Sequence, residues 1–346
     1  MRTLTMDDVE PAVYGGVVLG GGGGGRVTDS LANARLALTY GPVTLADPAE
    51  LDPDSTVAVM AGVGAPAAPD QYLVPVQHVR ALNLLREGLA KATGYQPLAA
   101  VVTNENGAMG TVNGWVQAAV TGLPVIDAAC NGRAHPTALM GSLGLHRDPD
   151  YLAWAGFAGG TGAYELEGLL RGKLAHVSSM IRTASVEAGG LVGVARNPVP
   201  VSRLVRDGAP GAISQALEVG AAVLAAGAAG VCKVLGGQIV ASGPVKGLRL
   251  EQRGGFDIGE VSVGDVRLLI ANEYMAADRA GQRIARFPDL TTTVSSETGM
   301  PVTSADLVDG MPVDVVVAPR EALKLSVTMD MPELLVSVEA LMGEKV

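Results

Sequence analysis

Aromatic residues are scarce in this sequence, since Phe, Trp and Tyr together make up only 3% of its 346 residues. An interior with so few rings must be filled by Ala, Val and Leu packed closely between backbones. Glycine is abundant, at 46 residues, and hydrophobic residues make up 48% of the chain. This composition excludes a disordered chain and favours layered α/β packing with a sizeable core.

Cysteine and basic residues are also limited. The two cysteines, Cys130 and Cys232, do not make a disulfide framework in a chain of this length, so we expect reduced thiols and a cytoplasmic protein. The formal net charge is −10 and no Lys/Arg-rich run occurs, which disfavours nucleic acid or an anionic membrane surface as a partner. The apolar runs are interrupted by Gly and charged residues, so we expect no membrane-spanning segment.

The pattern of apolar residues predicts two domains. Strand-like runs at 42–48, 56–64, 98–107 and 123–132 alternate with helical patterns at 76–94 and 109–122. This rhythm predicts an α/β domain over residues 1–238, with a mostly parallel sheet and helices on both faces. Short alternating segments separated by Gly, Pro and Asp predict a small β-rich domain over 239–346.

Six consecutive glycines, Gly20 to Gly25, lie between two predicted helices. They do not form a G-x-G-x-x-G dinucleotide fingerprint, because that motif follows the first strand of a βαβ unit. Without side chains in the way, the backbone N–H groups of Gly22, Gly23 and Gly24 could contact the oxygen of a small ligand. A flexible loop is the alternative.

Polar residues end the strand predicted at 98–107. Because ligands of parallel sheets bind beyond the carboxyl ends of the strands, Glu105 is a candidate general base or orienting carboxylate. The flanking Asn104 and Asn106 could hold the edge of a cyclic amide or urea. An ordinary turn rich in Asn and Gly is the alternative.

The next predicted strand ends in "DAACNGRAHP", which begins at Asp127. A thiol at a strand-to-helix turn can have its pKa lowered by helix-end amides and nearby cations. We therefore expect Cys130 as nucleophile, His135 as acid or base, and Asp127 as the group that holds the loop or the imidazole. Substrate contacts are expected from Asn131 and from Arg133, whose guanidinium could bind a carboxylate.

Two alternatives remain open for the same segment. The side chains of Cys130, His135 and His146 are sufficient in number for a catalytic zinc site, although their spacing matches no familiar zinc motif. Zinc is therefore possible, but the sequence requires no cofactor. The other alternative is that Cys130 is a small buried hydrophobic residue, as most free cysteines are.

Four segments resemble, in order and spacing, the S-methyl thiohydantoin desulfurase-like family. They are "LTMDDVEPAVYGGVVLGGGGGG", "VIDAACNGRAHPTALM", "GPVKGLRLEQRGGFDIGEV" and "FPDLTTTVSSETGMPVTSADLVDGMPVDVVVAP". The resemblance covers nearly the whole chain and implies an α/β domain followed by a small β-rich domain. It also implies a hydantoin or thiohydantoin substrate with an acidic side chain, and hydrolytic replacement of the ring sulfur or a related C–N or C–S cleavage.

The chain departs from the family pattern at the Cys130 segment. Acidic residues of that pattern are replaced by Ala129 and Thr137, and a thiol and an imidazole appear at Cys130 and His135. These departures indicate a divergent subgroup with altered chemistry. The amide-rich segment around Glu105 is kept, without its usual neighbouring glycine pair.

Together these observations predict an enzyme that acts on a small cyclic amide, imide or thio-analogue, by hydrolysis. A lyase or isomerase that abstracts a proton beside a carbonyl is one alternative. A non-catalytic subunit of a hydantoinase or oxoprolinase-type system is another. The Ala/Gly-rich, weakly charged composition also favours a homo-oligomer.

Overall fold

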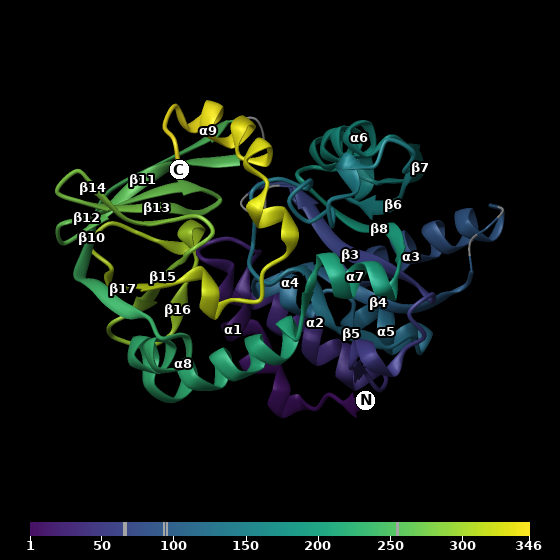
Figure 1. Cartoon of the computed structure of the whole chain (residues 1–346), viewed down its shortest axis with the longest axis horizontal. Helices are drawn as coiled ribbons and strands as arrows, with labels where there is room; N and C mark the ends of the chain where they lie inside the picture. The colour runs from purple at the N-terminus through teal and green to yellow at the C-terminus, as the bar shows by residue number, and fades with distance from the viewer. Residues whose placement is uncertain (65–67, 93, 95, 254–255) are drawn as a thin grey trace.

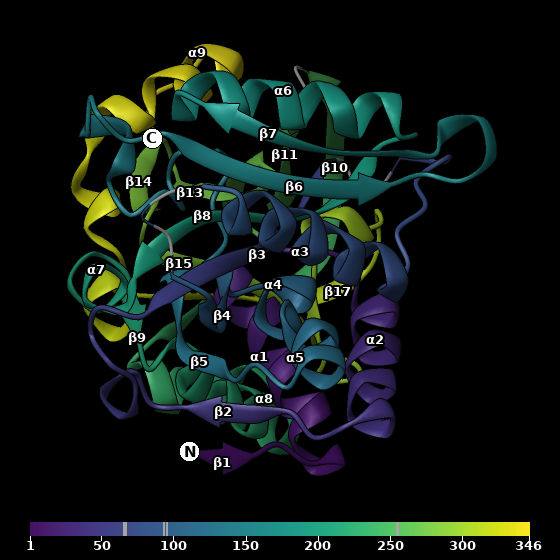
Figure 2. The same cartoon turned by 90° about the vertical axis from the view of Figure 1, so that its right-hand side faces the viewer.

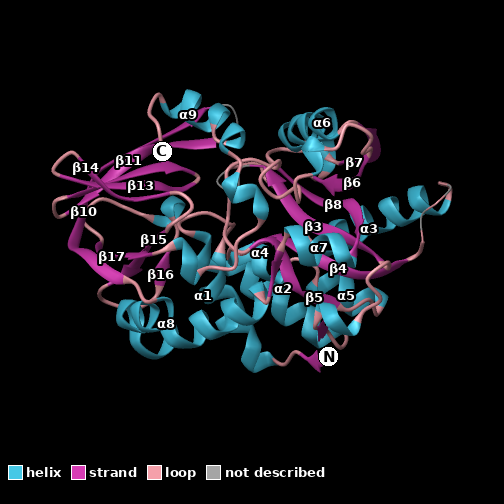
Figure 3. Ribbon diagram, in the orientation of Figure 1, coloured by secondary structure: helices cyan, strands magenta, loops and turns pink. Residues whose placement is uncertain are grey.

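The computed structural model describes residues 1–64, 68–92, 94, 96–253 and 256–346. Two sheets organise these residues, with helices packed around the first sheet and between the two (Figures 1 and 3). The sequence prediction of an α/β domain followed by a β-rich domain is confirmed. The first sheet and its helices occupy residues up to the end of helix α8, and the second sheet begins at Gln238.

Among the described residues the first sheet has nine strands in the order β1-β2-β5-β4-β3-β8-β6-β7, with β9 paired to β5. Strands β2, β5, β4 and β3 are parallel, whereas β8, β6 and β7 continue the sheet with antiparallel pairing (Figure 2). The strands are β1 (Arg2–Thr3), β2 (Thr44–Ala46), β3 (Thr56–Gly64), β4 (Leu98–Glu105), β5 (Val125–Asn131), β6 (Ala153–Gly159), β7 (Leu166–Gly172), β8 (Leu191–Pro200) and β9 (Ala209–Pro210).

Helices cover both faces of this sheet, as the sequence predicts. One apolar core includes Val13, Leu82 and Trp115, and the core on the other face includes Ile181 and Leu204. The helices are α1 (Val9–Gly20), α2 (Val27–Tyr40), α3 (Pro75–Ala90), α4 (Ala108–Val112), α5 (Trp115–Thr121), α6 (Leu174–Glu187), α7 (Val201–Asp207) and α8 (Ala212–Leu235).

Helices α1 and α8 pack closely against each other at glycine residues. A Cβ atom at Gly15 would lie 1.7 Å from the Ala216 carbonyl oxygen, and one at Gly220 would lie 1.8 Å from the Pro11 carbonyl oxygen. Only glycine permits such an approach of two backbones. Within the described residues, α8 alone is long and apolar enough to cross a membrane, but core helices of many proteins share these properties.

The second sheet is antiparallel throughout its described pairs, in the order β14-β13-β12-β11-β10-β17-β15-β16. Its strands are β10 (Gln238–Arg253), β11 (Phe256–Val263), β12 (Val266–Ala271), β13 (Glu273–Arg279), β14 (Gln282–Arg286), β15 (Leu290–Ser295), β16 (Pro301–Val302) and β17 (Pro312–Ala318). Short 3-10 turns occur at Met6–Asp8, Pro48–Glu50, Leu145–Arg147, Gly162–Tyr164, Ser304–Asp306, Arg320–Ala322, Val327–Asp330 and Pro332–Leu334.

The C-terminal segment, residues 319–346, passes between the two sheets, and its helix α9 (Val336–Met342) lies beside β11 of the second sheet (Figure 1, yellow). The Ser326 N–H donates to the side-chain oxygen of Asn131, at a distance of 3.1 Å. A Cβ atom at Gly132 would lie 1.7 Å from the Lys324 carbonyl oxygen, so this segment passes directly over the end of β5. The segment therefore covers the loop that follows β5.

Candidate active site

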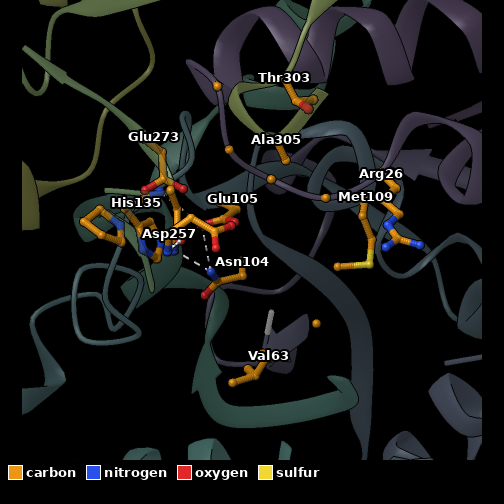
Figure 4. Close-up of a pocket in the computed structure, with 18 of the residues that line it drawn as sticks. Arg26, Val63, Asn104, Glu105, Met109, His135, Asp257, Glu273, Thr303 and Ala305 are labelled. Carbon is orange, nitrogen blue, oxygen red and sulfur yellow. Dashed lines mark hydrogen bonds and ion pairs between the residues drawn. The ribbon is translucent and has the colours of Figure 1, made fainter. Parts of the chain in front are cut away.

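A cavity of about 330 Å³ lies where the glycine loop, the carboxyl ends of strands in the first sheet and parts of the second sheet meet. This volume is at the lower end of the range for small-molecule sites and suits a ring-sized ligand. Figure 4 shows Glu105, His135, Asp257 and Glu273 on one side of the cavity and Arg26 and Met109 on the other. The cavity is thus lined by several carboxyl groups and by cationic groups, one of which, Arg26, lies apart from Glu105.

The glycine loop, residues Gly20 to Gly25, forms part of the wall. Gly22, Gly23 and Gly24 line the cavity, at the position where the sequence analysis expects ligand contact. The carbonyl oxygen of Gly22 accepts a hydrogen bond from the Ser304 N–H (2.9 Å), and that of Gly24 accepts one from the Met109 N–H (2.8 Å). These bonds fix the loop, and because the Gly23 N–H donates to the Gly20 carbonyl oxygen (3.3 Å), the N–H groups of Gly22 and Gly24 are the ones that the loop can offer to a ligand.

Two of these glycines are required by close approach. A Cβ atom at Gly23 would lie 2.1 Å from Glu273 Oε1. Gly24 has a φ of +93°, and a Cβ atom there would lie 2.4 Å from the Cα atom of Gly107. Glycine adopts this backbone conformation without strain and leaves room for both neighbours. The loop therefore lies against Glu273 and the segment after β4.

Glu105 lies at the end of β4 and is hydrogen bonded within a buried polar cluster. Its Oε2 atom lies 3.2 Å from His135 Nε2 and accepts a hydrogen bond from the His135 backbone N–H at 3.3 Å. The Asn104 amide nitrogen lies 3.4 Å from Glu105 Oε2 and 3.2 Å from His135 Nε2. Arg196 in β8 donates to the Asn104 side-chain oxygen at 2.8 Å, which orients the amide.

Burial sets the protonation of this cluster. Burial raises the pKa of Glu105 to about 7, although the His135 N–H and Arg196 favour the carboxylate. Burial lowers the pKa of His135 to about 3, and the nearby Arg196 charge acts in the same direction. His135 therefore stays neutral at physiological pH and can orient Glu105, but it is a poor proton donor. This departs from the predicted acid or base role.

Glu273, the first residue of β13, is a second carboxyl group on the same wall. Its side chain is 3% exposed, and its Oε2 atom has no hydrogen-bond partner among the described residues. Burial and the charge of Glu105 raise the pKa of Glu273 well above its usual value, and Arg133 acts in the opposite direction. The cavity therefore combines two carboxyl groups whose pKa values are both raised.

Arg133 lies beneath the glycine loop and is fully buried. Its Nη1 donates to the Pro288 carbonyl oxygen at 3.1 Å, and its guanidinium carbon lies 4.5 Å from the centroid of the Phe287 ring. It does not line the cavity. The predicted contact between Arg133 and a substrate carboxylate is therefore corrected: Arg133 joins the loop after β5 to the second sheet.

Cys130 requires the largest correction. Its side chain is fully buried in an apolar cluster with Ile126, Ala128 and Leu143, and it is not part of the cavity wall. Burial raises the pKa of this thiol to about 12. A reactive cysteine needs an accessible site that favours the thiolate, and Cys130 has neither property. We therefore do not retain Cys130 as a nucleophile, and the alternative of a small buried hydrophobic residue fits its position.

Three further predicted residues hold the structure together at some distance from the cavity. Asp127 accepts hydrogen bonds from the backbone N–H (2.9 Å) and hydroxyl (2.5 Å) of Ser214 in the first turn of α8, not from an imidazole. Asn106 donates to the carbonyl oxygens of Gly132 (3.2 Å) and Ala212 (3.0 Å). Asn131 bonds Ser326, as described above. Their predicted catalytic or substrate-binding roles are not supported by these positions, whereas Asn104 does line the cavity.

The suggested zinc ligands do not converge. His146 lies beside the C-terminal segment, with Nδ1 3.3 Å from the Ser142 hydroxyl and Nε2 3.5 Å from Glu333. Cys130 is in the apolar core, and only His135 reaches the cavity. In the part of the chain that the structure describes, no group of three His, Cys, Asp or Glu side chains is arranged to hold a metal ion.

The sequence analysis missed Glu273, and also Asp257, Arg182 and Arg196, which line the cavity. A signal for Glu273 was present. It is a single acidic residue inside the apolar run "LLIANEYMAA", where an alternating strand pattern would bury it. Because this run belongs to the second sheet, the spacing gave no reason to place it beside Glu105.

The fold and the cavity define a two-domain α/β protein with a cavity between its two sheets that two carboxyl groups, Glu105 and Glu273, line. The chain matches the models for the S-Me-THD-like N-terminal domain at residues 7–163 and the S-Me-THD-like C-terminal domain at residues 173–326, so it belongs to the S-Me-THD-like family. The second match begins at residue 173, whereas the second sheet begins at Gln238. The boundary between the two family models therefore differs from the boundary between the two sheets. The family name associates the chain with thiohydantoin chemistry.

A solved structure supports the fold. The crystal structure of a protein from Chromobacterium violaceum is similar to this chain with a TM-score of 0.74, over 100% of this chain and 99% of that chain, at 22% sequence identity. At this identity the likeness shows the fold alone. No curated protein matches the chain.

Proposed function

We propose that this protein is an enzyme that hydrolyses a cyclic amide, imide or thio-analogue of the hydantoin class, with Glu105 as the general base. The observation that carries this proposal is a carboxyl group with a pKa of about 7 on the wall of a ring-sized cavity. A base with a pKa near the working pH combines a useful ionised fraction with a strong tendency to accept a proton. Membership of the S-Me-THD-like family supports the substrate class.

In this proposal Glu105 removes a proton from a water molecule that attacks a ring carbon. The neutral His135 and the Asn104 amide hold the carboxylate in position. The N–H groups of the glycine loop would stabilise negative charge that develops on a ring heteroatom, and one such donor is worth roughly 3 kcal/mol in the transition state. Cys130 takes no part in the reaction.

The acidic side chain expected for the substrate would bind one of the cationic groups of the cavity wall. Arg26, Arg182 and Arg196 line the cavity, and the Nε atom of Arg196 has no hydrogen-bond partner among the described residues. Arg182 lies over the Phe256 ring, 4.7 Å from its centroid, which restricts its orientation. A carboxylate bound here would compensate buried positive charge.

The direct test uses an S-methyl thiohydantoin with a carboxyalkyl side chain in ¹⁸O-labelled water. We expect release of methanethiol and incorporation of one labelled oxygen into the ring product. Glu105→Gln should lower kcat by about 1,000-fold, because the amide cannot accept the proton. Glu218→Gln, on the exposed face of α8, is the matched control and should leave kcat unchanged.

Three outcomes would contradict this proposal. A product without solvent oxygen, together with exchange of the ring C–H proton, would favour a lyase or isomerase. Stabilisation by the ligand without turnover would favour a non-catalytic subunit. Full activity of Glu105→Gln would remove Glu105 from the mechanism while leaving the substrate class in place.

A further inference from the structure

Glu273 is a buried carboxyl group that the second sheet contributes to the cavity. It follows Asn272, where φ is +60° and the chain turns tightly from β12 into β13. The Asn272 N–H donates to the Asp257 carbonyl oxygen at 2.8 Å, and the Asn272 side-chain oxygen accepts from the Asp257 N–H at 2.9 Å. These bonds fix the turn and hold Glu273 at the cavity wall.

The contacts of Glu273 leave one oxygen available to a ligand. Its Oε1 atom lies against the bare backbone of Gly23, where a Cβ atom would be 2.1 Å away. Its Oε2 atom is buried and unpaired among the described residues. A buried polar atom without a partner is unfavourable by about 1–3 kcal/mol, and such atoms are therefore rare unless they have a function. Oε2 is thus a candidate for contact with the reacting molecule.

The charges around Glu273 favour its protonated form. Glu105 and Asp257 both repel a negative charge on Glu273, and burial disfavours it further. Arg133 is the nearby positive charge and acts in the opposite direction, but less than burial and Glu105 do. Because each negative charge disfavours the other, a low-dielectric cavity that both carboxyl groups line favours ionisation of only one of them near neutral pH.

We propose that Glu273 is the proton donor to the leaving group, and that Glu105, on the same wall of the cavity, is the base. This inference rests on the proposed function, because it assigns a second catalytic residue to the same site. The two domains thus each supply one carboxyl group: Glu105 comes from β4 of the first sheet, and Glu273 comes from β13 of the second.

For an S-methyl thiohydantoin the proton transfers balance as follows. Water forms a C–O bond to the ring carbon that carries sulfur, Glu105 takes one water proton, and the C=N electron pair moves to the ring nitrogen. That pair then re-forms the C=N bond while the C–S bond breaks, and Glu273 gives its proton to the sulfur, so methanethiol leaves. The hydroxyl-bearing ring is a tautomer of the hydantoin, and exchange with solvent restores both carboxyl groups.

The test compares two leaving groups in the full-length protein. Glu273→Gln should lower kcat by about 100-fold for the S-methyl substrate, because the thiolate must leave without a proton. For an S-(4-nitrophenyl) thiohydantoin, whose thiolate leaves readily, the loss should be below about 10-fold. Glu105→Gln is the matched control and should lose activity equally on both substrates.

The proton on Glu273 can also be observed directly. In protein labelled with ¹³C at the Glu carboxyl carbons, the signal that Glu273→Gln removes should stay protonated at a higher pH than the signal that Glu105→Gln removes. This measurement needs no turnover and uses the wild-type protein for the titration, and Glu273→Asp, whose Asp carboxyl is not labelled, assigns the Glu273 signal if Glu273→Gln is poorly folded. Glu273→Asp, which keeps a proton donor, should recover part of the activity on the S-methyl substrate.

Equal losses of Glu273→Gln on both substrates, or ionisation of Glu273 at a lower pH than Glu105, would overturn the donor role. These results differ from failure of the proposed function, in which the wild-type protein releases no thiol from either substrate. In that case neither Glu105 as the base nor Glu273 as the proton donor would be supported for this reaction.

Discussion

Strands β4 and β5 are parallel neighbours, yet their carboxyl ends have different surroundings. Glu105 at the end of β4 lies opposite Asn131 at the end of β5 in the ladder. Glu105 faces the cavity, whereas Asn131 and Gly132 are covered by the C-terminal segment. The edge of a parallel sheet is therefore a place where a site can form, but the segment that crosses each strand end decides whether one does.

The largest loss of stability should come from a substitution at the end of β5, which the C-terminal segment covers. Gly132→Ala would place a Cβ atom 1.7 Å from the Lys324 carbonyl oxygen, so the C-terminal segment or the loop must move. Overpacking of this kind is unfavourable by roughly 3 kcal/mol, at the upper end of its usual range. We expect the free energy of unfolding in urea to fall by about that amount.

Gly172→Ala is the matched control, because a Cβ atom there would meet only Val177 at 3.7 Å, an ordinary contact. Its stability should be close to that of the wild type. If Gly132→Ala were equally stable, the C-terminal segment would not be packed on the end of β5, and the contrast between the two strand ends would be wrong.

Much of the first domain could be predicted from the sequence. The alternation of apolar runs and helical patterns placed β3, β4, β5 and α3 close to their observed positions, because those signals are local in the chain. The position of Glu105 and Asn104 at the cavity follows from the same rule, since ligands bind beyond the carboxyl ends of parallel strands. The antiparallel pairing of β8 with β3 and β6 joins segments that are far apart in the chain, so local sequence patterns did not predict it.

The rest of the site depends on contacts between distant segments. Glu105 and Glu273 are 168 residues apart in sequence, and Asn131 and Ser326 are 195 apart. Spacing within one segment cannot show that such residues meet. The error at Cys130 has another cause, because polar neighbours in sequence suggested a polar site. In a strand, however, alternate residues face opposite sides, and Cys130 shares its side with Ile126 and Ala128.

Glu105, at the end of β4 that faces the cavity, should make the free energy of unfolding depend on pH. Because the pKa of Glu105 is about 7 in the folded protein and 4.5 in its reference state, the folded state binds more protons than the unfolded state between these pH values. The stability of the wild type therefore falls as pH rises from about 4.5 to about 7, by roughly 3 kcal/mol from this group. Glu105→Gln lacks this group. The free energy of unfolding of Glu105→Gln minus that of the wild type should therefore increase as pH rises from about 4.5 to about 7.

Chemical denaturation of both proteins at pH 4, 5.5 and 8 measures this difference. Glu218→Gln, an exposed substitution on α8, should show a difference from the wild type that does not change with pH in this way. A constant difference between Glu105→Gln and the wild type from pH 4 to pH 8 would mean that the Glu105 pKa is not raised, and the general-base assignment would lose its main support.

The smallest effect should come from Cys130, on the covered strand. Cys130→Ala removes one sulfur atom from an apolar cluster and should lower the free energy of unfolding by only about 1 kcal/mol, with kcat unchanged. In the native protein iodoacetamide should modify the partly exposed Cys232 but not Cys130, whose thiol is buried and has a raised pKa. Rapid alkylation of Cys130 with loss of activity would show instead that the end of β5 opens to the cavity. The two strand ends would then contribute to one site, and a thiol mechanism would have to be considered again.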